Sequence, residues 1–146
     1  MAAKAAGATG ALGDEMDFSM QVAARTLWQE ARGENAIGRR AVAHVLANRL
    51  KSGKWGATLA EVCLYPFAFS GWNPRDPNRL AAARLADDDP LLIALAAMIE
   101  AACDGTDPDP TNGATNYYAP GALAAPPAWA ARMSPCGAFG SQLFFR

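Results

Sequence analysis

Apolar residues recur at helical spacing in two consecutive stretches, and this pattern predicts two amphipathic helices. The first helix is expected over residues 18–32, with Asp17 as its N-cap and Gly33 at its end. Its buried face would consist of Met20, Ala23, Ala24, Leu27 and Ala31. The second helix is expected over residues 36–51, capped by Asn35. Its apolar stripe would be Ile37, Ala41, Val42, Val45, Leu46 and Leu50, with Arg39, Arg40, Asn48 and Arg49 largely off that stripe.

Capping signals predict three further helices. Residues 58–61, Thr-Leu-Ala-Glu, form a capping box that opens a short helix. Two Asp-Pro pairs then open helices over residues 77–86 and 90–103, because aspartate caps the helix and proline suits its first position. The last of these is strongly apolar and is expected to be a central buried helix, through Leu91, Leu92, Ile93, Leu95, Met98 and Ile99.

The remaining segments are less regular. Residues 66–74 are aromatic and too rich in Pro, Gly and Asn for a regular element. Residues 115–119 and 141–145 are expected to pair as a small β ribbon, and residues 125–133 could hold a short helical turn. The fold class is therefore α+β, mostly α, with a minor β element.

Length and composition favour one domain. The chain has 146 residues, 51% of them hydrophobic, which is enough for a single core. Residues 1–15, rich in Ala and Gly, are expected to be a flexible N-terminal arm, and residues 16–146 a single catalytic domain. No signal peptide or apolar run of roughly 18 residues is visible, so no membrane insertion is expected. A net charge of −1 gives no indication of a nucleic-acid partner.

Glu30 is the strongest candidate for chemistry. It lies near the expected end of the first helix, where the helix dipole and partial burial both disfavour an ionised carboxylate. A carboxyl group that stays protonated near pH 7 suits a general acid. Glu34 lies just beyond the break, where it could face the same site, cap the second helix, or pair with Arg39 or Arg40.

Four ordered blocks of sequence resemble the spore-cortex-lytic type of cell wall hydrolase. The first is Ala24-Arg-Thr-Leu-Trp-Gln-Glu-Ala-Arg-Gly-Glu34, and the second is Arg40-Ala-Val-Ala-His-Val-Leu-Ala-Asn-Arg49 after Gly38. The third is Glu61-Val-Cys-Leu-Tyr-Pro-Phe-Ala-Phe-Ser70 with Trp72-Asn73. The fourth is Asp109-Pro-Thr-Asn-Gly-Ala114 with Asn116-Tyr-Tyr118 and Pro120. The resemblance covers about residues 22–145.

The resemblance implies a lysozyme-like or lytic-transglycosylase-like fold and cleavage of the peptidoglycan glycan strand between N-acetylmuramic acid and N-acetylglucosamine. The family's catalytic glutamate corresponds to Glu30. Substrate contacts are expected from Glu34, Phe69, Ser70, Trp72, Asn73, Asn116, Tyr117, Tyr118 and Gln142. Many members carry a histidine where this chain has Gln142, which can form hydrogen bonds but cannot titrate. Trp28, Tyr65 and Phe67 are further aromatic candidates for a groove around Glu30.

The expected mechanism depends on how many catalytic carboxylates the sequence offers. Glycosidases commonly use two, yet no second catalytic acid stands out in this sequence. A lytic transglycosylase works with one glutamate, because a sugar hydroxyl attacks and forms an anhydro product. This mechanism is favoured over a muramidase, with peptidoglycan as the partner and no metal or cofactor. We expect a monomer, of a phage or prophage endolysin type, made in the cytoplasm and reaching the wall after holin-type release.

Two rival interpretations remain open at this point. One is a Cys–His amidase or peptidase that uses His44, the single histidine, with Cys63, Cys103 or Cys136. No nucleophile signature surrounds any of these cysteines, so buried structural residues are favoured and one disulfide is allowed. The other rival is a non-catalytic, wall-binding or structural module of the same fold.

Overall fold

The structure, a computed structural model, describes residues 16–66 and 68–146. The expected N-terminal arm, residues 1–15, and the groove candidate Phe67 lie outside the described residues. The α-helices are α2 (Phe18–Glu30), α3 (Ala36–Ser52), α4 (Leu59–Leu64), α5 (Pro77–Ala83) and α6 (Pro90–Asp104). Short 3₁₀ helices are η1 (Ser70–Trp72), η2 (Pro120–Ala122) and η3 (Ala128–Arg132).

Helix α2 is fixed at both ends by local hydrogen bonds. The Asp17 side chain accepts a hydrogen bond from the Met20 N–H at 2.8 Å, as expected for an N-cap. The C-cap is Ala31, whose N–H donates to the Leu27 carbonyl. The predicted end at Gly33 is therefore wrong by two residues, because the chain already leaves helical geometry at Ala31. Glu30 becomes the last residue of the helix.

Helix α3 begins and ends close to its predicted bounds. The Asn35 side chain caps it by accepting from the Gly38 N–H, and Gly53 ends it in the left-handed conformation at φ 75°. Ile37, predicted to be buried, is 61% exposed, and the buried residues of α3 begin only at Gly38. Arg49, predicted to lie off the buried stripe, is only 6% exposed. The burial of Arg49 is important for the candidate active site.

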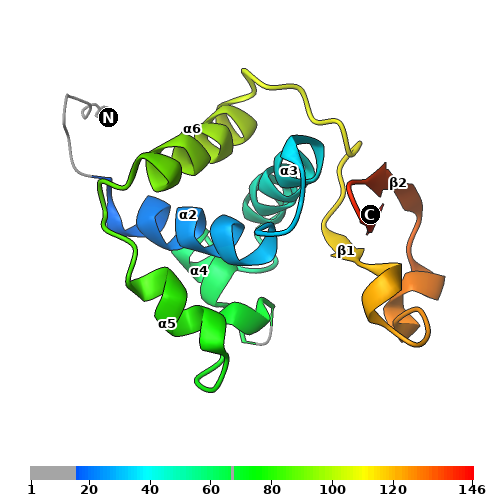
Figure 1. Ribbon diagram of the computed structural model, residues 1–146. Coiled ribbons are helices and arrows are strands. Elements are labelled where there is room, and N and C mark those ends of the chain that lie inside the picture. Colours follow the sequence, from blue (N-terminus) through cyan, green and yellow to red (C-terminus); the bar gives the residue numbers. More distant parts are fainter. Residues whose placement is uncertain (1–15, 67) are drawn as a thin grey trace.

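Helix α6 is a peripheral helix, so its predicted central position is wrong. It packs against α2 and α3 with one face, through Leu92, Leu95 and Ile99. Leu91 and Ile93, also predicted to be buried, are exposed. In Figure 1, α2 lies between α6 and α5, and it also contacts α3 and α4. Helix α2 is thus the packing centre of the helical layer.

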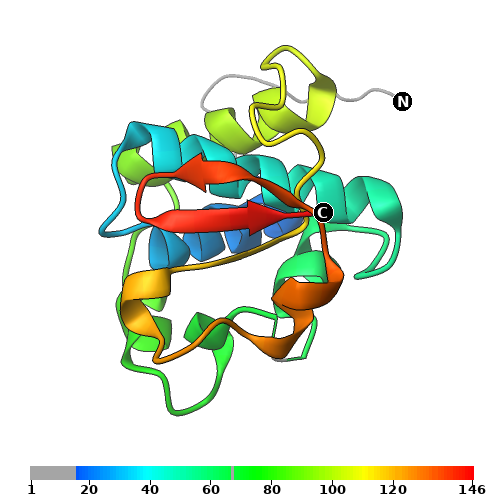
Figure 2. The same cartoon turned by 90° about the vertical axis from the view of Figure 1, so that its right-hand side faces the viewer.

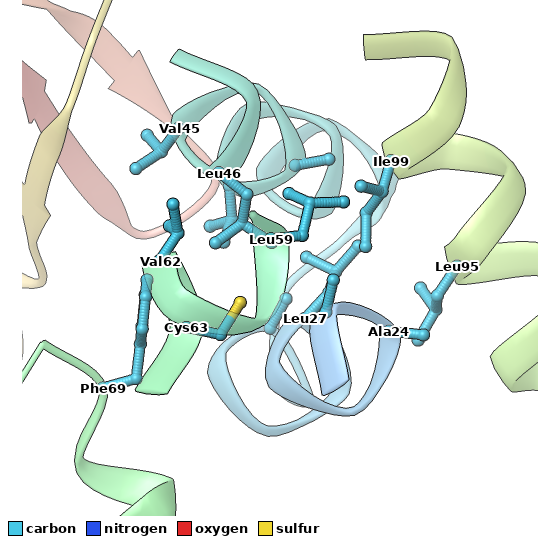
Figure 3. Close-up of a cluster of buried hydrophobic side chains, with 14 of the residues drawn as sticks. Ala24, Leu27, Val45, Leu46, Leu59, Val62, Cys63, Phe69, Leu95 and Ile99 are labelled. Carbon is cyan, nitrogen blue, oxygen red and sulfur yellow. The ribbon is translucent and has the colours of Figure 1, made fainter. Parts of the chain in front are cut away.

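The core is formed where α2, α3, α4 and α6 meet. Leu27, Leu46, Val62 and Ile99 are fully buried there and point toward one another (Figure 3). Each such side chain contributes about 1.5–3 kcal/mol to the free energy of unfolding. This packing holds the last turn of α2, and therefore Glu30, in a fixed place.

A three-stranded antiparallel sheet follows the helices, with strand order β1-β3-β2. β1 (Asn116–Tyr118) pairs with β3 (Gln142–Phe145), which confirms the predicted ribbon. β2 (Pro135–Phe139) was missed, since Pro and Gly both disfavour a strand. It is an edge strand with a register shift between Pro135 and Gly137, a position where such residues are tolerated.

The sheet packs against one side of the helical layer, next to α3 (Figures 1 and 2). Phe144 is fully buried and stacks on Tyr117, with the ring centroids 5.3 Å apart. On the other side of the strands, Tyr118, Trp129 and Phe145 form an aromatic cluster. The sheet thereby brings β1 toward the end of α2. Within the described residues, no helix has both the length and the apolar character needed to cross a membrane.

Candidate active site

The centre of the site is a hydrogen bond between Glu30 and Tyr117. Glu30 is the last residue of α2, and Tyr117 is the middle residue of β1. The Tyr117 hydroxyl donates to the Glu30 Oε1 at 2.5 Å. These residues are 87 positions apart in sequence, so the sheet and the helical layer must both be folded for them to meet.

The surroundings of Glu30 favour its protonated form. Burial raises the pKa of Glu30 above its usual value, and this effect outweighs the hydrogen bond from Tyr117 and the charge of Arg49, which lower it. The charge of Asp76 raises the pKa further. The raised pKa agrees with the prediction made from the sequence. Burial also raises the pKa of Tyr117 well above its usual value, so its hydroxyl remains a donor.

Arg49 is the site residue that the sequence analysis missed. Its Nε donates to the Thr115 carbonyl at 2.7 Å, immediately before β1. Its guanidinium lies over the rings of Trp55 and Phe69, with the carbon 4.7 and 5.1 Å from the two centroids. A signal was present in the sequence, because position 49 follows Val42, Val45 and Leu46 at i+7, i+4 and i+3.

The aromatic loop between α4 and α5 is tied to α2 near Glu30. Trp72 Nε1 donates to the Thr26 Oγ1 at 2.7 Å, one helical turn before Glu30. Gln29 Nε2 donates to the Gly71 carbonyl at 3.3 Å. These two bonds place η1 beside the last turn of α2. Trp72 is half-buried there, and its contact with substrate stays a prediction.

The structure separates the two adjacent tyrosines. Tyr117 points toward Glu30, whereas Tyr118 stacks on Phe145, with the ring centroids 5.7 Å apart, and contacts Trp129. Successive residues of a strand face opposite sides, so only one could reach the glutamate. The structure therefore assigns the contact with Glu30 to Tyr117.

Both carboxylate oxygens of Glu34 accept hydrogen bonds from Ser141. Its Oε1 accepts from the Ser141 N–H at 2.8 Å, and its Oε2 accepts from the Ser141 hydroxyl at 2.5 Å. Ser141 lies in the turn between β2 and β3. Glu34 thus joins the turn after α2 to the β hairpin. The predicted pairing with Arg39 takes another form, because Arg39 donates to the Glu34 backbone carbonyl at 2.7 Å.

The other predicted substrate contacts differ in exposure. Phe69 is 3% exposed and belongs to the core, so it is not an open groove wall (Figure 3). Ser70 is exposed at the start of η1, and Asn73 follows its end half-buried. Asn116 is half-buried on β1, and its Oδ1 accepts from the Thr115 hydroxyl at 3.0 Å. Ser70, Asn73 and Asn116 remain predicted substrate contacts.

Two aromatic candidates lie elsewhere. Trp28 lines a depression with Leu91 and Leu95 of α6, and the Arg32 guanidinium lies 4.2 Å from the Trp28 ring centroid. Tyr65 lines an open, mostly apolar depression of about 520 Å³ with Phe18 and Trp55 among others. The lining of neither depression includes Glu30. Their groove role is therefore not supported by the structure.

Gln142 is buried at the start of β3, with 8% exposure. Among the described residues, its Oε1 has no hydrogen-bond partner. Gln142 lies opposite Phe139 in the sheet and next to Ser141, which binds Glu34. Its predicted contact with substrate stays a prediction.

The arrangement around His44 gives no support to a Cys–His enzyme. His44 Nε2 lies 2.9 Å from Asp107 Oδ2, and its Nδ1 lies 3.7 Å from Asp109 Oδ1. All three cysteines are free, so the allowed disulfide is not formed. Burial raises the pKa of Cys63 to about 12, which leaves it a thiol at neutral pH. His44 is thus a hydrogen-bonded structural histidine.

Comparisons with known proteins decide the family. The family model described as Cell Wall Hydrolase matches residues 33–145. The chain belongs to the cell wall hydrolase family. No curated protein matches this cell wall hydrolase. The matched region begins three residues after Glu30, so the role of Glu30 must be argued from the geometry of the site.

Two solved structures share the fold of this cell wall hydrolase. The catalytic domain of the germination-specific lytic transglycosylase SleB from Bacillus anthracis is 24% identical, with a TM-score of 0.67. The match covers 93% of this chain and all of that one. The catalytic domain of the Bacillus cereus SleB protein is also 24% identical, with a TM-score of 0.68, over 97% of this chain and 99% of that one. The predicted fold class is confirmed.

The described residues contain no cluster of three or more His, Cys, Asp or Glu side chains that could hold a metal ion. The site's own side chains offer a partly buried carboxyl, a phenol that binds it, and a buried guanidinium nearby.

Proposed function

We propose that this cell wall hydrolase cleaves the glycan strand of peptidoglycan as a lytic transglycosylase, with Glu30 as general acid and then general base. The observation that carries the proposal is the partly buried Glu30, with its raised pKa, hydrogen-bonded to Tyr117 at 2.5 Å. Membership of the family and the shared fold with SleB catalytic domains support the same substrate class.

In the first step Glu30 donates its proton to the glycosidic oxygen that links N-acetylmuramic acid to N-acetylglucosamine. The bond from that oxygen to the anomeric carbon breaks, and the sugar develops positive charge as Glu30 becomes a carboxylate. Tyr117 already binds Oε1, and the described residues offer Oε2 no hydrogen-bond partner. Oε2 is thus the oxygen suited to carry and deliver the proton.

In the second step the 6-hydroxyl of the muramic acid attacks its own anomeric carbon. A new bond forms from that oxygen to the carbon, and Glu30 takes the hydroxyl proton, which returns the glutamate to its starting state. The product is a 1,6-anhydro sugar. No water is consumed, so no second carboxylate is needed to activate one.

The neighbouring carboxylates support this mechanism over hydrolysis. Both oxygens of Glu34 accept hydrogen bonds from Ser141. The charge of Asp76 raises the pKa of Glu30, but Asp76 Oδ1 caps α5 by accepting from the Asn78 N–H at 2.8 Å. A muramidase in which Asp76 activates water is the alternative that this charge effect favours.

The substrate would lie between the aromatic loop and β1. Trp72 is held beside α2 by Thr26, and Ser70, Asn73 and Asn116 offer polar groups for hydroxyl and N-acetyl groups. We place these residues, with Tyr117, along the walls of the glycan site.

Mass spectrometry of digested peptidoglycan tests the proposal. Muropeptides that end in 1,6-anhydromuramic acid, 18 Da lighter than the reducing products (one water, H₂O), are expected. Reducing products that disappear in Asp76→Asn would favour the muramidase instead. New free amines without glycan cleavage, or no release at all, would contradict both glycan mechanisms.

A further inference from the structure

Arg49 is an unusual residue for the interior of a small domain. Its side chain is 6% exposed, and its Nη1 has no hydrogen-bond partner among the described residues. No carboxylate among the described residues lies within ion-pair distance of the Arg49 guanidinium. Buried arginines are rare unless paired, and arginine stays charged in proteins. A positive charge is therefore held in the core at a cost in folding free energy that calls for an explanation.

The contacts of Arg49 hold that charge in one place. Nε donates to the Thr115 carbonyl, and the planar guanidinium lies against the rings of Trp55 and Phe69. Cation–π contacts of this kind favour the flat guanidinium over the ammonium of lysine. Arg49 thus links α3 to the residue that precedes β1, two positions before Tyr117.

Four groups act on the charge of Glu30 or respond to it. They are Tyr117 from β1, which is hydrogen-bonded to it, Arg49 from α3, Asp76 before α5, and Cys63 from α4. Arg49 is the cation in this set, and it lowers the pKa of Glu30. Its charge also acts on Tyr117 and Cys63. Arg49 therefore stands at the electrostatic centre of the site although it lies outside hydrogen-bond reach of Glu30.

We propose that Arg49 is a positioning residue that stabilises the carboxylate form of Glu30 between donation and recovery of the proton. This inference rests on the proposed function, in which Glu30 must be a good acid first and a carboxylate afterwards. Burial alone would make Glu30 hold its proton too firmly, because the ionised product would be isolated in an apolar site. The fixed charge of Arg49 offsets that isolation, and the bond to Thr115 keeps Tyr117 aligned with the same carboxyl.

The test compares Arg49→Gln, which removes the charge but keeps a hydrogen-bond donor, with Arg49→Lys, which keeps the charge. Lys51→Gln is the matched control, since it removes an exposed positive charge from the same helix. Two properties are measured in each protein. The first is the titration of Glu30, followed by NMR of its side-chain carboxyl carbon. The second is the pH profile of muropeptide release.

In Arg49→Gln the midpoint of the Glu30 titration is expected to rise, and the alkaline limb of the pH profile is expected to move with it. The maximal rate should fall about tenfold, because the proton leaves Glu30 less readily. Arg49→Lys should keep the midpoint near that of the unaltered protein, and Lys51→Gln should change neither property. A folded Arg49→Gln protein with an unchanged Glu30 midpoint would overturn the proposal. A rise of the Glu30 midpoint in Arg49→Lys as large as that in Arg49→Gln would also overturn it.

A measurement on the unaltered protein covers the case in which Arg49→Gln does not fold. The Arg49 Nε resonance should follow the titration of Glu30, and this dependence should vanish in Glu30→Gln. An Arg49 resonance that ignores the Glu30 titration would contradict the proposal. The NMR readouts are independent of lysis, so a failure of Glu30 as catalyst would appear separately, as retained activity in Glu30→Gln.

Discussion

Two carboxylates interact with cations of the same helix, α3, yet their pKa values are shifted in opposite directions. Asp107 lies at the surface, where Arg40 donates from Nε and Nη2 at 2.8 Å and His44 Nε2 lies 2.9 Å away. These hydrogen bonds lower the pKa of Asp107 to about 2. Glu30 lies in a partly buried site, where burial dominates and its pKa is raised.

The comparison separates two uses of a carboxylate. At Asp107 the ionised form is hydrogen-bonded and solvated, so the group joins the loop after α6 to α3. At Glu30 the neutral form is favoured, and the nearby Arg49 acts through space only. The first arrangement supports stability and the second supports proton transfer.

The largest effect is expected from Glu30→Gln. The amide cannot donate the proton, so the rate of muropeptide release should fall about 1,000-fold or more. Because ionised Glu30 is disfavoured in the folded state, the amide should also keep or raise Tm at neutral pH. Calorimetry and product analysis measure the two effects. Glu100→Gln, an exposed change on α6, is the control, and a folded Glu30→Gln protein with normal activity would refute the assignment.

Tyr117→Phe should have the next largest effect. In the unaltered protein, the hydrogen bond from Tyr117 to Glu30 Oε1 lowers the pKa of Glu30. Tyr117→Phe removes this bond, so the pKa of Glu30 should rise further. We expect the rate to fall about tenfold and the alkaline limb of the pH profile to move upward. Tyr118→Phe, on the other face of β1, provides the matched comparison. Equal effects of the two changes would show that packing, rather than the phenol, matters.

Asp107→Asn should affect stability and leave the rate of lysis nearly unchanged. The folded pKa of Asp107, about 2, lies below the ordinary aspartate value. Its contribution to the free energy of unfolding is therefore present above about pH 4 and is lost as pH falls toward 2. The variant should melt about 3 °C lower at pH 7. This difference should shrink between pH 4 and about 2, as thermal unfolding at several pH values would show. A constant difference over that range would contradict the ion-pair interpretation.

Ser141→Ala should have the smallest effect. It removes the hydroxyl bond to Glu34 but keeps the backbone N–H bond, at a cost of about 0.5–1.5 kcal/mol in the free energy of unfolding. Urea unfolding measures this loss. Activity should stay within about twofold if Glu34 is structural. A large fall in activity with unchanged stability would restore Glu34 as a substrate contact.

The parts of the fold that the sequence revealed are those set by local chemistry. Asp17, Asn35 and Thr58 each cap the helix that they were predicted to cap, because the bonds join residues three apart. The catalytic candidate Glu30 also followed from a local motif and from the family resemblance. Such features need no knowledge of the rest of the chain.

The missed features depend on contacts between distant residues. Arg49 follows the apolar stripe of α3, yet its burial needs Phe69 from the aromatic loop and Thr115 before β1. Strand β2 exists only because β3 lies beside it. Helix α6 is apolar on most sides, so its sequence could not show that only one face would be covered. A charge or a strand whose partner lies far along the chain leaves a weak local signal.

The strand order has a consequence for the timing of synthesis. β3 is the middle strand of the sheet, yet it follows β1 and β2 in sequence. A nascent chain on the ribosome can form the helical layer, with Glu30 in place, before β3 has emerged. Until then β1 has no neighbour to pair with, and nothing aligns Tyr117 with the glutamate. The proposed catalytic pair is therefore assembled last, so chain elongation and completion of the site are separated in time.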